Sequence, residues 1–550
     1  MTETLAPVDV ALVGLGAANG IAAHVLTEAG LDVAALEAGP RLSVADFAQD
    51  EVANRVRLSQ PKALHELPTW RARAGEAAAP SRWPMLMVNA VGGTSVHYEG
   101  LSIRLSPWNF ASRTRTIERY GAGAIPADST LADWPFSYDE LEPYYDLVER
   151  AIGVSGADGN PFEGPRSAGY PMPALRQTGW NELLADAARR LGWHPFPAPA
   201  AINSEPYDGR AACTYCGFCM LNVCHCEAKG ATDVNVIRLA EATGRLRVET
   251  GSRVTRIETG PDGLATGATF VRDGRECFQP ARAVLIGTFT FENVRLLLLS
   301  RSKAHPSGLG NGHGQVGRHF IAHITPFVFG RFPGRRLNLM TGVGSQATCV
   351  EDHDADNFDH SEARFIGGGM LSALQELTPL AFVRGPLPPS VPRWGSGWKA
   401  WVKANAHSVG SINGQVDALA YEDTYLDLDP ERTDPHGVPV VRVTHSVHDN
   451  ERAAATYLEA AMRDWLLEAG AAETWASPGR PVEGRHCYGG TRMGRDRETS
   501  VVDGYGLLHD APNVGIVGAS TFPTAGGVNP TLTVQATAWR TAEQVVRTLA

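Results

Sequence analysis

The sequence contains no apolar run long enough to cross a membrane. A transmembrane helix needs roughly 18 or more consecutive apolar residues, and no hydrophobic stretch in the chain approaches that length. The first ten residues, MTETLAPVDV, have neither the basic region nor the apolar core of an export signal. The sequence therefore predicts no membrane span and, by itself, a cytoplasmic location.

Positive charge is also scarce. The chain has 49 Lys and Arg residues against 60 Asp and Glu residues, a formal net charge of -11, and no basic stripe. A surface that binds nucleic acid needs clustered cations to neutralise phosphates. We therefore expect no nucleic-acid partner.

What is present is typical of a globular protein. Hydrophobic residues make up 43% of the 550 positions and charged residues 20%. A chain of this length exceeds what one hydrophobic core usually serves, so we expect two domains that can be interleaved in sequence.

The segment from Val8 to Pro40 predicts a strand, a glycine turn, a helix and a second strand. We expect strands over 8–13 and 32–36, with a helix that ends at Gly30. Glu37 lies roughly 20 residues beyond the turn, where an acidic side chain meets the ribose of a dinucleotide. The pattern indicates a Rossmann unit, and its turn and helix residues are Gly14, Gly16, Asn19 and Gly20. Asn19 stands where a glycine packs the helix against the strand, which predicts a slightly displaced helix.

A second glycine turn contains Gly92, Gly93, Thr94 and Ser95, and His97 follows it. Such a turn exposes backbone and can lie along a flavin or a phosphate. It is equally typical of an ordinary loop.

Further along, residues 133–156 have the spacing of an amphipathic helix, and residues 157–210 are rich in Gly, Pro and Ala, which favours a surface wrap. A strand near Arg247 would pass the adenine end of a dinucleotide. Residues 281–300 again predict strand, glycine turn and helix, so the Rossmann domain resumes there.

The region from about 320 to 480 is different in pattern. Alternating stretches over 327–332 and 438–443 predict an antiparallel sheet, and 451–469 predicts a helix. Residues 385–397 form a proline-rich loop, either a lid or a partner surface. His319 and His323 lie four residues apart, and we interpret them as core histidines rather than a metal pair.

Five of the eight cysteines fall within fourteen residues: Cys213, Cys216, Cys219, Cys224 and Cys226. Closely spaced thiolates suit an iron–sulfur cluster. A structural zinc usually takes paired elements that are well separated, so we favour the cluster over zinc and over reduced core cysteines. The spacing also favours a reducing compartment over disulfides.

Two motifs close the chain, HCYGGTRMG from His486 and GGVNPTLT from Gly526. Asn529 suits an N-cap and Pro530 a first helical position, which predicts a helix over 530–549. The start of that helix would aim its amides at a reduced flavin, which is negative near N1. Oxidation of an alcohol also needs a base within hydrogen-bond reach of the hydroxyl, and His486 can serve as that base. Asn529 can donate to the developing alkoxide.

Together these motifs resemble the glucose-methanol-choline (GMC) flavoprotein oxidoreductases, in the branch of gluconate 2-dehydrogenase and related sugar dehydrogenases, with pyranose oxidases as neighbours. The likeness spans nearly the whole chain: GLGAANG with Glu37, VGGTSVHY, DWPFSYDELEPYY, CTYCGFC, TFENVRLLLLS, HCYGGTRMG and GGVNPTLT. It implies an α/β fold with a Rossmann-type FAD-binding domain interleaved with an α+β substrate domain on an antiparallel sheet. The implied boundaries are 1–318 and 481–550 for the first domain, with a cysteine insertion at about 205–232, and 319–480 for the second.

The resemblance also assigns site residues. His486 and Asn529 match its catalytic pair. Its FAD-binding positions match Gly14, Gly16, Asn19, Gly20, Glu37, Gly92, Gly93, Thr94, Ser95, His97, Val254, Gly518, Ala519, Pro530 and Thr531. In some relatives the histidine that matches His97 bonds covalently to the flavin. Here Tyr98 stands where those relatives have Trp, so the resemblance is compatible with covalent and with non-covalent FAD.

The cysteines separate the branches of the family. Cys213, Cys219 and Cys224 resemble the ligands of a [3Fe-4S] cluster, with Cys216 as a fourth candidate. That branch implies a sugar, glycoside or sugar acid oxidised at a secondary alcohol, and electrons passed to a cytochrome or quinone-linked acceptor. A small companion subunit commonly provides export, which makes a periplasmic location compatible with the sequence. The alternatives are an oxygen-using, pyranose-oxidase-like enzyme and an electron-transfer flavoprotein without its own substrate.

Overall fold

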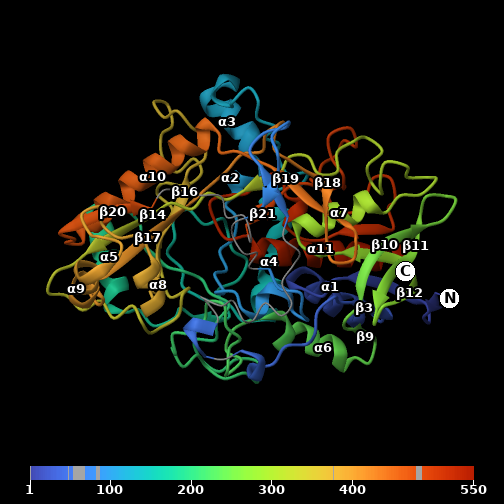
Figure 1. The fold of residues 1–550 in the computed structure, drawn as a ribbon, viewed down its shortest axis with the longest axis horizontal. Helices are drawn as coiled ribbons and strands as arrows, with labels where there is room; N and C mark the ends of the chain where they lie inside the picture. The colour runs from blue at the N-terminus through green and yellow to red at the C-terminus, as the bar shows by residue number, and fades with distance from the viewer. Residues whose placement is uncertain (1, 48, 54–67, 82–86, 376, 478–485) are drawn as a thin grey trace.

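The computed structural model describes residues 2–47, 49–53, 68–81, 87–375, 377–477 and 486–550. Two sheets dominate it and lie on opposite sides of the molecule (Figure 1). Both chain termini lie on the side of the larger sheet. Within these residues, no helix combines the length and the apolar character needed to cross a membrane.

The larger sheet has eight strands and is built around the predicted Rossmann unit. β2 (Val8–Val13), α1 (Ala17–Glu28) and β3 (Val33–Leu36) follow the expected pattern, and Gly30 ends the helix with a φ of +87°. The strand order is β10-β11-β12-β2-β3-β9, and β1 and β22 also pair with β12. The strand pairs next to β2 are parallel, whereas β10, β11 and β12 are antiparallel.

Asn19 does not loosen α1 from the sheet, contrary to the sequence interpretation. Its side-chain amide donates to the carbonyls of Val13 (3.0 Å), Gly14 (2.8 Å) and Leu285 (3.3 Å). Gly20 instead provides the close approach, because a Cβ there would lie 2.9 Å from Thr232. The amide therefore ties the helix to the strands, and the neighbouring glycine makes room.

Segments distant in sequence complete this half. β9 (Leu246–Glu249), β10 (Arg253–Thr259), β11 (Ala265–Arg272) and β12 (Arg275–Ile286) precede α7 (Thr290–Leu299), so the predicted resumption of strand, turn and helix is present. β22 (Val514–Ile516) and α11 (Thr531–Leu549) return from the end of the chain, and α11 packs on α1 and on α4 (Tyr138–Ile152).

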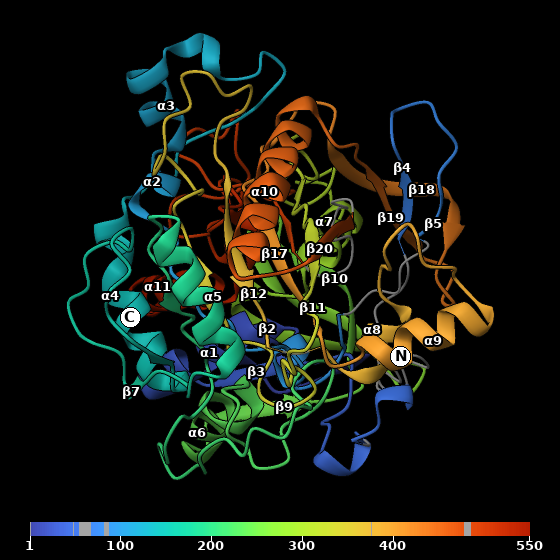
Figure 2. The same cartoon turned by 90° about the vertical axis from the view of Figure 1, so that its left-hand side faces the viewer.

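The second sheet is antiparallel and has the order β20-β14-β17-β16-β15-β8. Its strands are β8 (Phe196–Pro197), β14 (Phe327–Arg331), β15 (Thr348–Val350), β16 (Gly369–Ala373), β17 (Val409–Val416) and β20 (Glu473–Ser477). One face packs on α10 (Asp449–Glu468), and the other lies beside α8 (Pro379–Arg384) and α9 (Gly395–Asn405) (Figures 1 and 2).

Two sequence expectations hold only in part in this half. Residues 438–443 do not join the second sheet, because β19 (Pro439–Thr444) pairs with β18 (Tyr425–Thr433) and β4 (Thr69–Arg71) in a separate four-stranded sheet that β5 (Ala79–Pro80) completes. Residues 157–210 are not only a surface wrap. They contain α5 (Gly179–Arg190), whose buried Trp180 packs in the core beneath α10.

The remaining elements are short. They are β1 (Glu3–Thr4), β6 (Ser155–Gly156), β7 (Met172–Pro173), β13 (Ile321–Ala322), β21 (Cys487–Tyr488), α2 (Pro107–Phe110), α3 (Ser112–Tyr120) and α6 (Val236–Ala242), together with several single 3₁₀ turns. The antiparallel pair β13–β21 matters most for function, because it joins the two halves of the molecule at His323 and His486.

Candidate active site

A large cavity of about 1240 Å³ runs from the Rossmann turn to the second sheet. One end is lined by the turn after β2 and by Glu37, and the other by β14 and β17. His486 and Asn529 lie along its wall. An elongated dinucleotide and a smaller molecule could therefore occupy one continuous space.

The turn after β2 is shaped for close approach. Gly14 has a φ of +77°, and a Cβ there would lie 2.9 Å from the Gly287 carbonyl oxygen. A Cβ on Gly93 would lie 2.8 Å from the Gly16 Cα, so the two glycine turns touch backbone to backbone. Side chains at these positions would push apart the two loops that line the cavity.

Glu37 ends β3 and is buried, 5% exposed. Its carboxylate accepts hydrogen bonds from the backbone N–H groups of Leu15 and Gly39, both at 2.8 Å. Burial raises the pKa of this carboxyl to about 7, partly offset by those two N–H donors. The carboxylate thus lies at the glycine turn, where it can accept hydrogen bonds from ribose hydroxyls.

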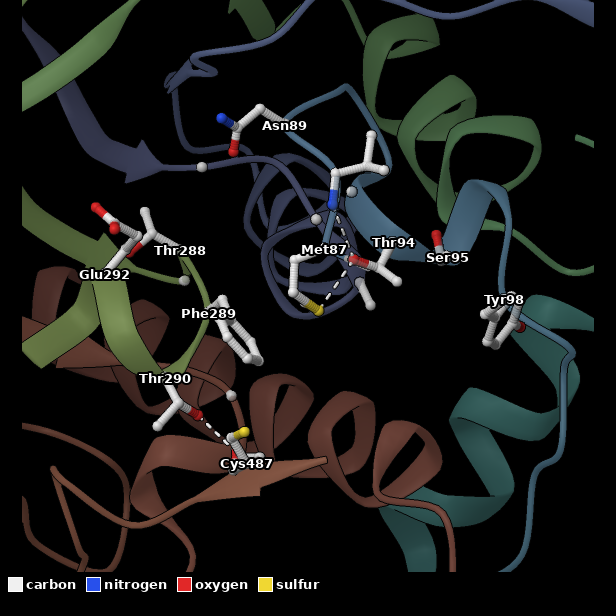
Figure 3. A pocket seen from close by; sticks show the side chains of 18 of the residues that line it. Met87, Asn89, Thr94, Ser95, Tyr98, Thr288, Phe289, Thr290, Glu292 and Cys487 are labelled. Carbon is white, nitrogen blue, oxygen red and sulfur yellow. Dashed lines mark hydrogen bonds between the residues drawn. The ribbon is translucent and has the colours of Figure 1, made fainter. Parts of the chain in front are cut away.

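The second glycine turn forms the opposite wall. Figure 3 shows Thr94, whose hydroxyl bonds to Met87, and Ser95 and Tyr98 on the segment that follows. Phe289 reaches into the cavity from the turn between β12 and α7, with a φ of +78°. His97 also lines the cavity and is 3% exposed. The predicted motif therefore faces the same space as the Rossmann turn.

The structure brings most predicted site residues together. Those that line the cavity are Gly14, Gly16, Glu37, Gly93, Thr94, Ser95, His97, Val254, His486, Gly518, Ala519, Asn529, Pro530 and Thr531. Asn19, Gly20 and Gly92 are not among the lining residues and support the wall from behind.

The two predicted catalytic side chains face each other. The Asn529 amide nitrogen lies 3.5 Å from His486 Nε2, and the Asn529 Oδ1 accepts a 2.7 Å hydrogen bond from Gln415 on β17. The second bond fixes the amide orientation, with oxygen toward Gln415 and nitrogen toward the imidazole. A histidine nitrogen and an amide donor thus point to one place in the cavity wall.

His323 contacts His486 and thereby positions the catalytic pair. The sequence did not predict this functional role, since His323 was interpreted there as a core histidine. Its Nε2 lies 2.7 Å from the Gly526 carbonyl oxygen, and its Nδ1 lies 3.1 Å from His486 Nδ1. A carbonyl can only accept, so His323 carries its proton on Nε2. Burial lowers the pKa of His323 to about 4, which keeps the ring neutral and leaves Nδ1 as an acceptor. His486 must then donate from Nδ1, and in the neutral ring this leaves Nε2 unprotonated beside Asn529.

Asn529 does not cap α11 as expected from sequence. The helix begins at Thr531, Pro530 occupies the capping position, and no side chain caps the helix. The amide of Asn529 is instead engaged by Gln415 and His486. The side chain of Asn529 therefore forms part of the catalytic site and does not cap the helix.

Buried carboxyls lie under the loop that carries Asn529. Asp417 accepts a hydrogen bond from the Gly526 backbone, and a Cβ on Gly527 would lie 2.3 Å from Asp354 Oδ1. Burial raises the pKa of Asp354 to about 7 and that of Asp417 well above its usual value. His323 therefore binds the carbonyl of Gly526, and Asp417 binds its N–H.

Replacing Asp354 with Asn should remove part of the pH dependence of stability. The native carboxyl retains its proton to about pH 7, whereas the unfolded one releases it near its ordinary value of 3.8. Between these values the native state binds more protons, so wild-type stability should fall by up to about 1.4 kcal/mol per pH unit as the pH rises. Thermal unfolding at a series of pH values should show that the stability of D354N depends less on pH than that of wild type. The stability of the variant relative to wild type should therefore increase toward pH 7.

The exposed Asp158 provides the matched control. D158N should follow the wild-type curve at every pH. Parallel curves for wild type and D354N would contradict the buried, protonated state of Asp354.

The described cysteines of residues 213–226 do not form a recognisable metal site. Cys224 and Cys226 have their sulfur atoms 3.7 Å apart, Cys219 is buried among apolar side chains, and Cys216 is exposed. Burial raises the pKa of Cys213 to about 11. Over the residues that the structure describes, no three His, Cys, Asp or Glu side chains converge to hold a metal ion. These positions do not assemble the expected ligand set, and the cluster stays a prediction from the sequence.

The fold and the cavity define a class of protein. A Rossmann unit with a buried acidic residue at its second strand, joined through one cavity to an antiparallel sheet and a histidine–asparagine pair, is an arrangement for a dinucleotide-dependent oxidoreductase. The sequence matches the GMC oxidoreductase family over residues 131–325 and 420–538. The chain belongs to that family, whose members are FAD-dependent and act on CH–OH donors.

Curated relatives cover almost the whole chain. The gluconate 2-dehydrogenase flavoprotein of Pantoea cypripedii is 33% identical over 99% of this chain and 94% of its own length. The paromamine 6'-oxidase of Streptomyces fradiae is 31% identical over 98% and 91%. The fructose dehydrogenase large subunit of Gluconobacter japonicus is 26% identical over 100% and 99%. The family thus includes both dehydrogenases and oxidases that are similar to this chain.

Solved structures share the fold. Pyridoxine 4-oxidase from Mesorbium loti superposes with a TM-score of 0.64 at 18% identity, covering 98% of each chain. Formate oxidase from Aspergillus oryzae gives the same TM-score at 14% identity. The α/β architecture predicted from the sequence is confirmed.

Proposed function

We propose that the chain is a dehydrogenase that oxidises a secondary alcohol of a sugar, glycoside or sugar acid to a ketone. The observation that carries the proposal is the His486–Asn529 pair, which lines the same cavity as the Rossmann turn. Similarity to a gluconate 2-dehydrogenase flavoprotein and a fructose dehydrogenase large subunit supports a polyhydroxylated substrate.

FAD fits the residues present. Glu37 and Val254 would hold the adenosine, the Gly14–Gly16 turn with Gly93 the pyrophosphate, and Thr94, Ala519 and the start of α11 the flavin end. His97 faces the same space, so both covalent and non-covalent attachment remain part of the proposal. When bound, the flavin supplies the acceptor at N5 for the hydride that leaves the alcohol carbon.

The protein residues would handle the proton and the oxygen. His486 Nε2 takes the hydroxyl proton, and its Nδ1–H stays bonded to the neutral His323, which stabilises the imidazolium that forms. Asn529 Nδ2, fixed by Gln415, donates to the oxygen as negative charge develops there. Both side chains are half-buried, so water screens these two interactions less than it would at the surface.

Electrons must then leave the protein, and we propose a separate acceptor, a cytochrome or a quinone-linked partner with a small companion subunit. The fructose dehydrogenase relative is a large subunit, which supports an assembly of this kind. A [3Fe-4S] relay at Cys213, Cys216, Cys219 and Cys224 is still a prediction, and no step of the mechanism passes through it. Export with such a partner would place the enzyme outside the cytoplasm.

Anaerobic reduction of the holoenzyme tests the proposal. We expect aldonates, free hexoses or glycosides to bleach the flavin under nitrogen, and an added dye to restore its colour faster than air does. Stoichiometric peroxide at the rate of turnover would instead support an oxidase, the second candidate, which similarity to a paromamine 6'-oxidase favours. A flavin that no alcohol bleaches would reject both.

A further inference from the structure

The cavity continues past His486 and Asn529 over one face of β17. Successive residues of a strand point to opposite faces, so Ser411, Asn413 and Gln415 share one face. All three line the cavity, whereas Ile412 and Val416 lie in the core beneath α10. The sheet therefore presents a row of neutral polar side chains to whatever enters.

The row begins at the catalytic pair. Gln415 donates to Asn529 and is thereby part of the site already described. Asn413, the next residue on this face, is 7% exposed, and its Oδ1 has no hydrogen-bond partner in the described part of the chain. A strand rises about 3.3 Å per residue, so Asn413 lies about 7 Å beyond Gln415. An amide at this distance can bond a hydroxyl on the far side of a hexose ring.

An aromatic row runs beside the polar one. β14 pairs with β17 so that Phe327 is opposite Asn413 and Phe329 is opposite Ser411. Phe327 and Phe329 have centroids 6.4 Å apart, and Phe329 stacks on Trp475 at 5.8 Å and 11°. Both phenylalanines line the cavity. Residues opposite each other in an antiparallel pair share a face, so one bound ligand would meet Phe327 and Asn413 together.

The cavity is apolar at its end beside α8. Leu377, Ala381 and Pro386 close it from the side of α8, and the Trp475 indole N–H donates to the Pro386 carbonyl at 2.9 Å. Among the described lining residues of β14, β17 and 377–386, none carries an ionisable side chain. A carboxylate would therefore find no cation to pair with among these described residues.

Resting on the proposed function, the geometry points to a neutral glycoside as the substrate, with its sugar ring between the catalytic pair and Asn413 and an apolar aglycone on Phe327 and Phe329. The sugar ring would receive hydrogen bonds from the amides, and the aglycone would receive apolar contact from Phe327 and Phe329. The aglycone would fill the apolar end that a free hexose leaves empty. A sugar acid would bring its charge to a wall of amides and aromatic rings.

Binding to the oxidised holoenzyme tests this inference without turnover. Methyl and phenyl β-D-hexopyranosides of the gluco, galacto and manno series, and gluconate, would be titrated while the flavin spectrum is followed. We expect a phenyl glycoside to bind at least about tenfold more tightly than its methyl partner, and gluconate to bind most weakly. F327A should weaken the phenyl glycoside by about tenfold and the methyl glycoside far less. N413A should weaken both alike.

Control variants keep the result interpretable. Trp394, 83% exposed, is an aromatic residue outside the cavity, and W394A should bind every ligand as wild type does. F327L, a milder change, replaces F327A if the latter loses flavin or unfolds. Gluconate binding more tightly than both glycosides, or a phenyl preference that survives F327A and F327L, would overturn the inference. Glycosides that bind as expected but never bleach the flavin would support this subsite and reject the proposed oxidation.

Discussion

Replacing His486 with alanine is expected to slow reduction of the bound flavin by alcohols by about 10³-fold, because a positioned general base contributes 10²- to 10⁴-fold. Its Nε2 is the unprotonated nitrogen beside Asn529, and no other described imidazole faces that amide. Without it the hydroxyl proton has no acceptor as the hydride leaves. Stopped-flow absorbance under nitrogen measures the rate directly.

A surface histidine gives the matched control for H486A. His194 has 56% of its side chain exposed and pairs with Asp352. H194A should reduce its flavin within about twofold of the wild-type rate, since surface substitutions rarely have larger effects. The flavin content of both variants should equal that of wild type, because the proposed FAD contacts do not include His486 or His194. A wild-type rate in H486A would remove the base from the mechanism.

Loss of His323 is expected to cost about 10²-fold in the same rate, although His323 does not line the cavity. His323 is a positioning residue, because it acts through His486. In H323L the Nδ1–H of His486 loses its acceptor, so the imidazole can place its proton on Nε2 and turn away from the alcohol. The apparent KM should change little while kcat falls, since substrate contacts remain.

A conservative variant separates this role from packing. Asn at position 323 can place a carbonyl oxygen close to the present Nδ1, and H323N should therefore recover most of the rate that H323L loses. If His323 served only for packing, H323L would reduce flavin faster than H323N, because Leu suits the buried site better than Asn. If H323L reduces flavin as fast as wild type, the tautomer assignment is wrong.

Local patterns in the sequence were sufficient for the Rossmann half. The glycine turn, the position of Glu37 and the strand, turn and helix at 281–300 follow from periodicity and turn chemistry over short distances. The helix at the end of the chain was also predicted, apart from its cap. These features depend on neighbours in sequence, which is why the sequence reveals them.

Features that depend on distant pairing were missed. His323 could be seen only as one of two histidines four residues apart, because its partner is 163 positions away and is reached through the β13–β21 pair. β19 lies between β18 and β4, and nothing in its own sequence distinguishes pairing with β4 from pairing with β14. Asn19 was misjudged because the rule for glycine considers volume and not the hydrogen bonds that an amide can add.

Flavin reduction with a carbon-deuterated alcohol is the most direct test of the central claim that this cavity oxidises a CH–OH group beside His486 and Asn529. The holoenzyme is mixed under nitrogen with a glycoside carrying hydrogen or deuterium at the oxidised carbon, and the loss of flavin absorbance is timed. We predict bleaching that is several-fold slower with deuterium. A flavin that stays oxidised with every alcohol, or that bleaches at equal rates with both isotopes, would contradict the account.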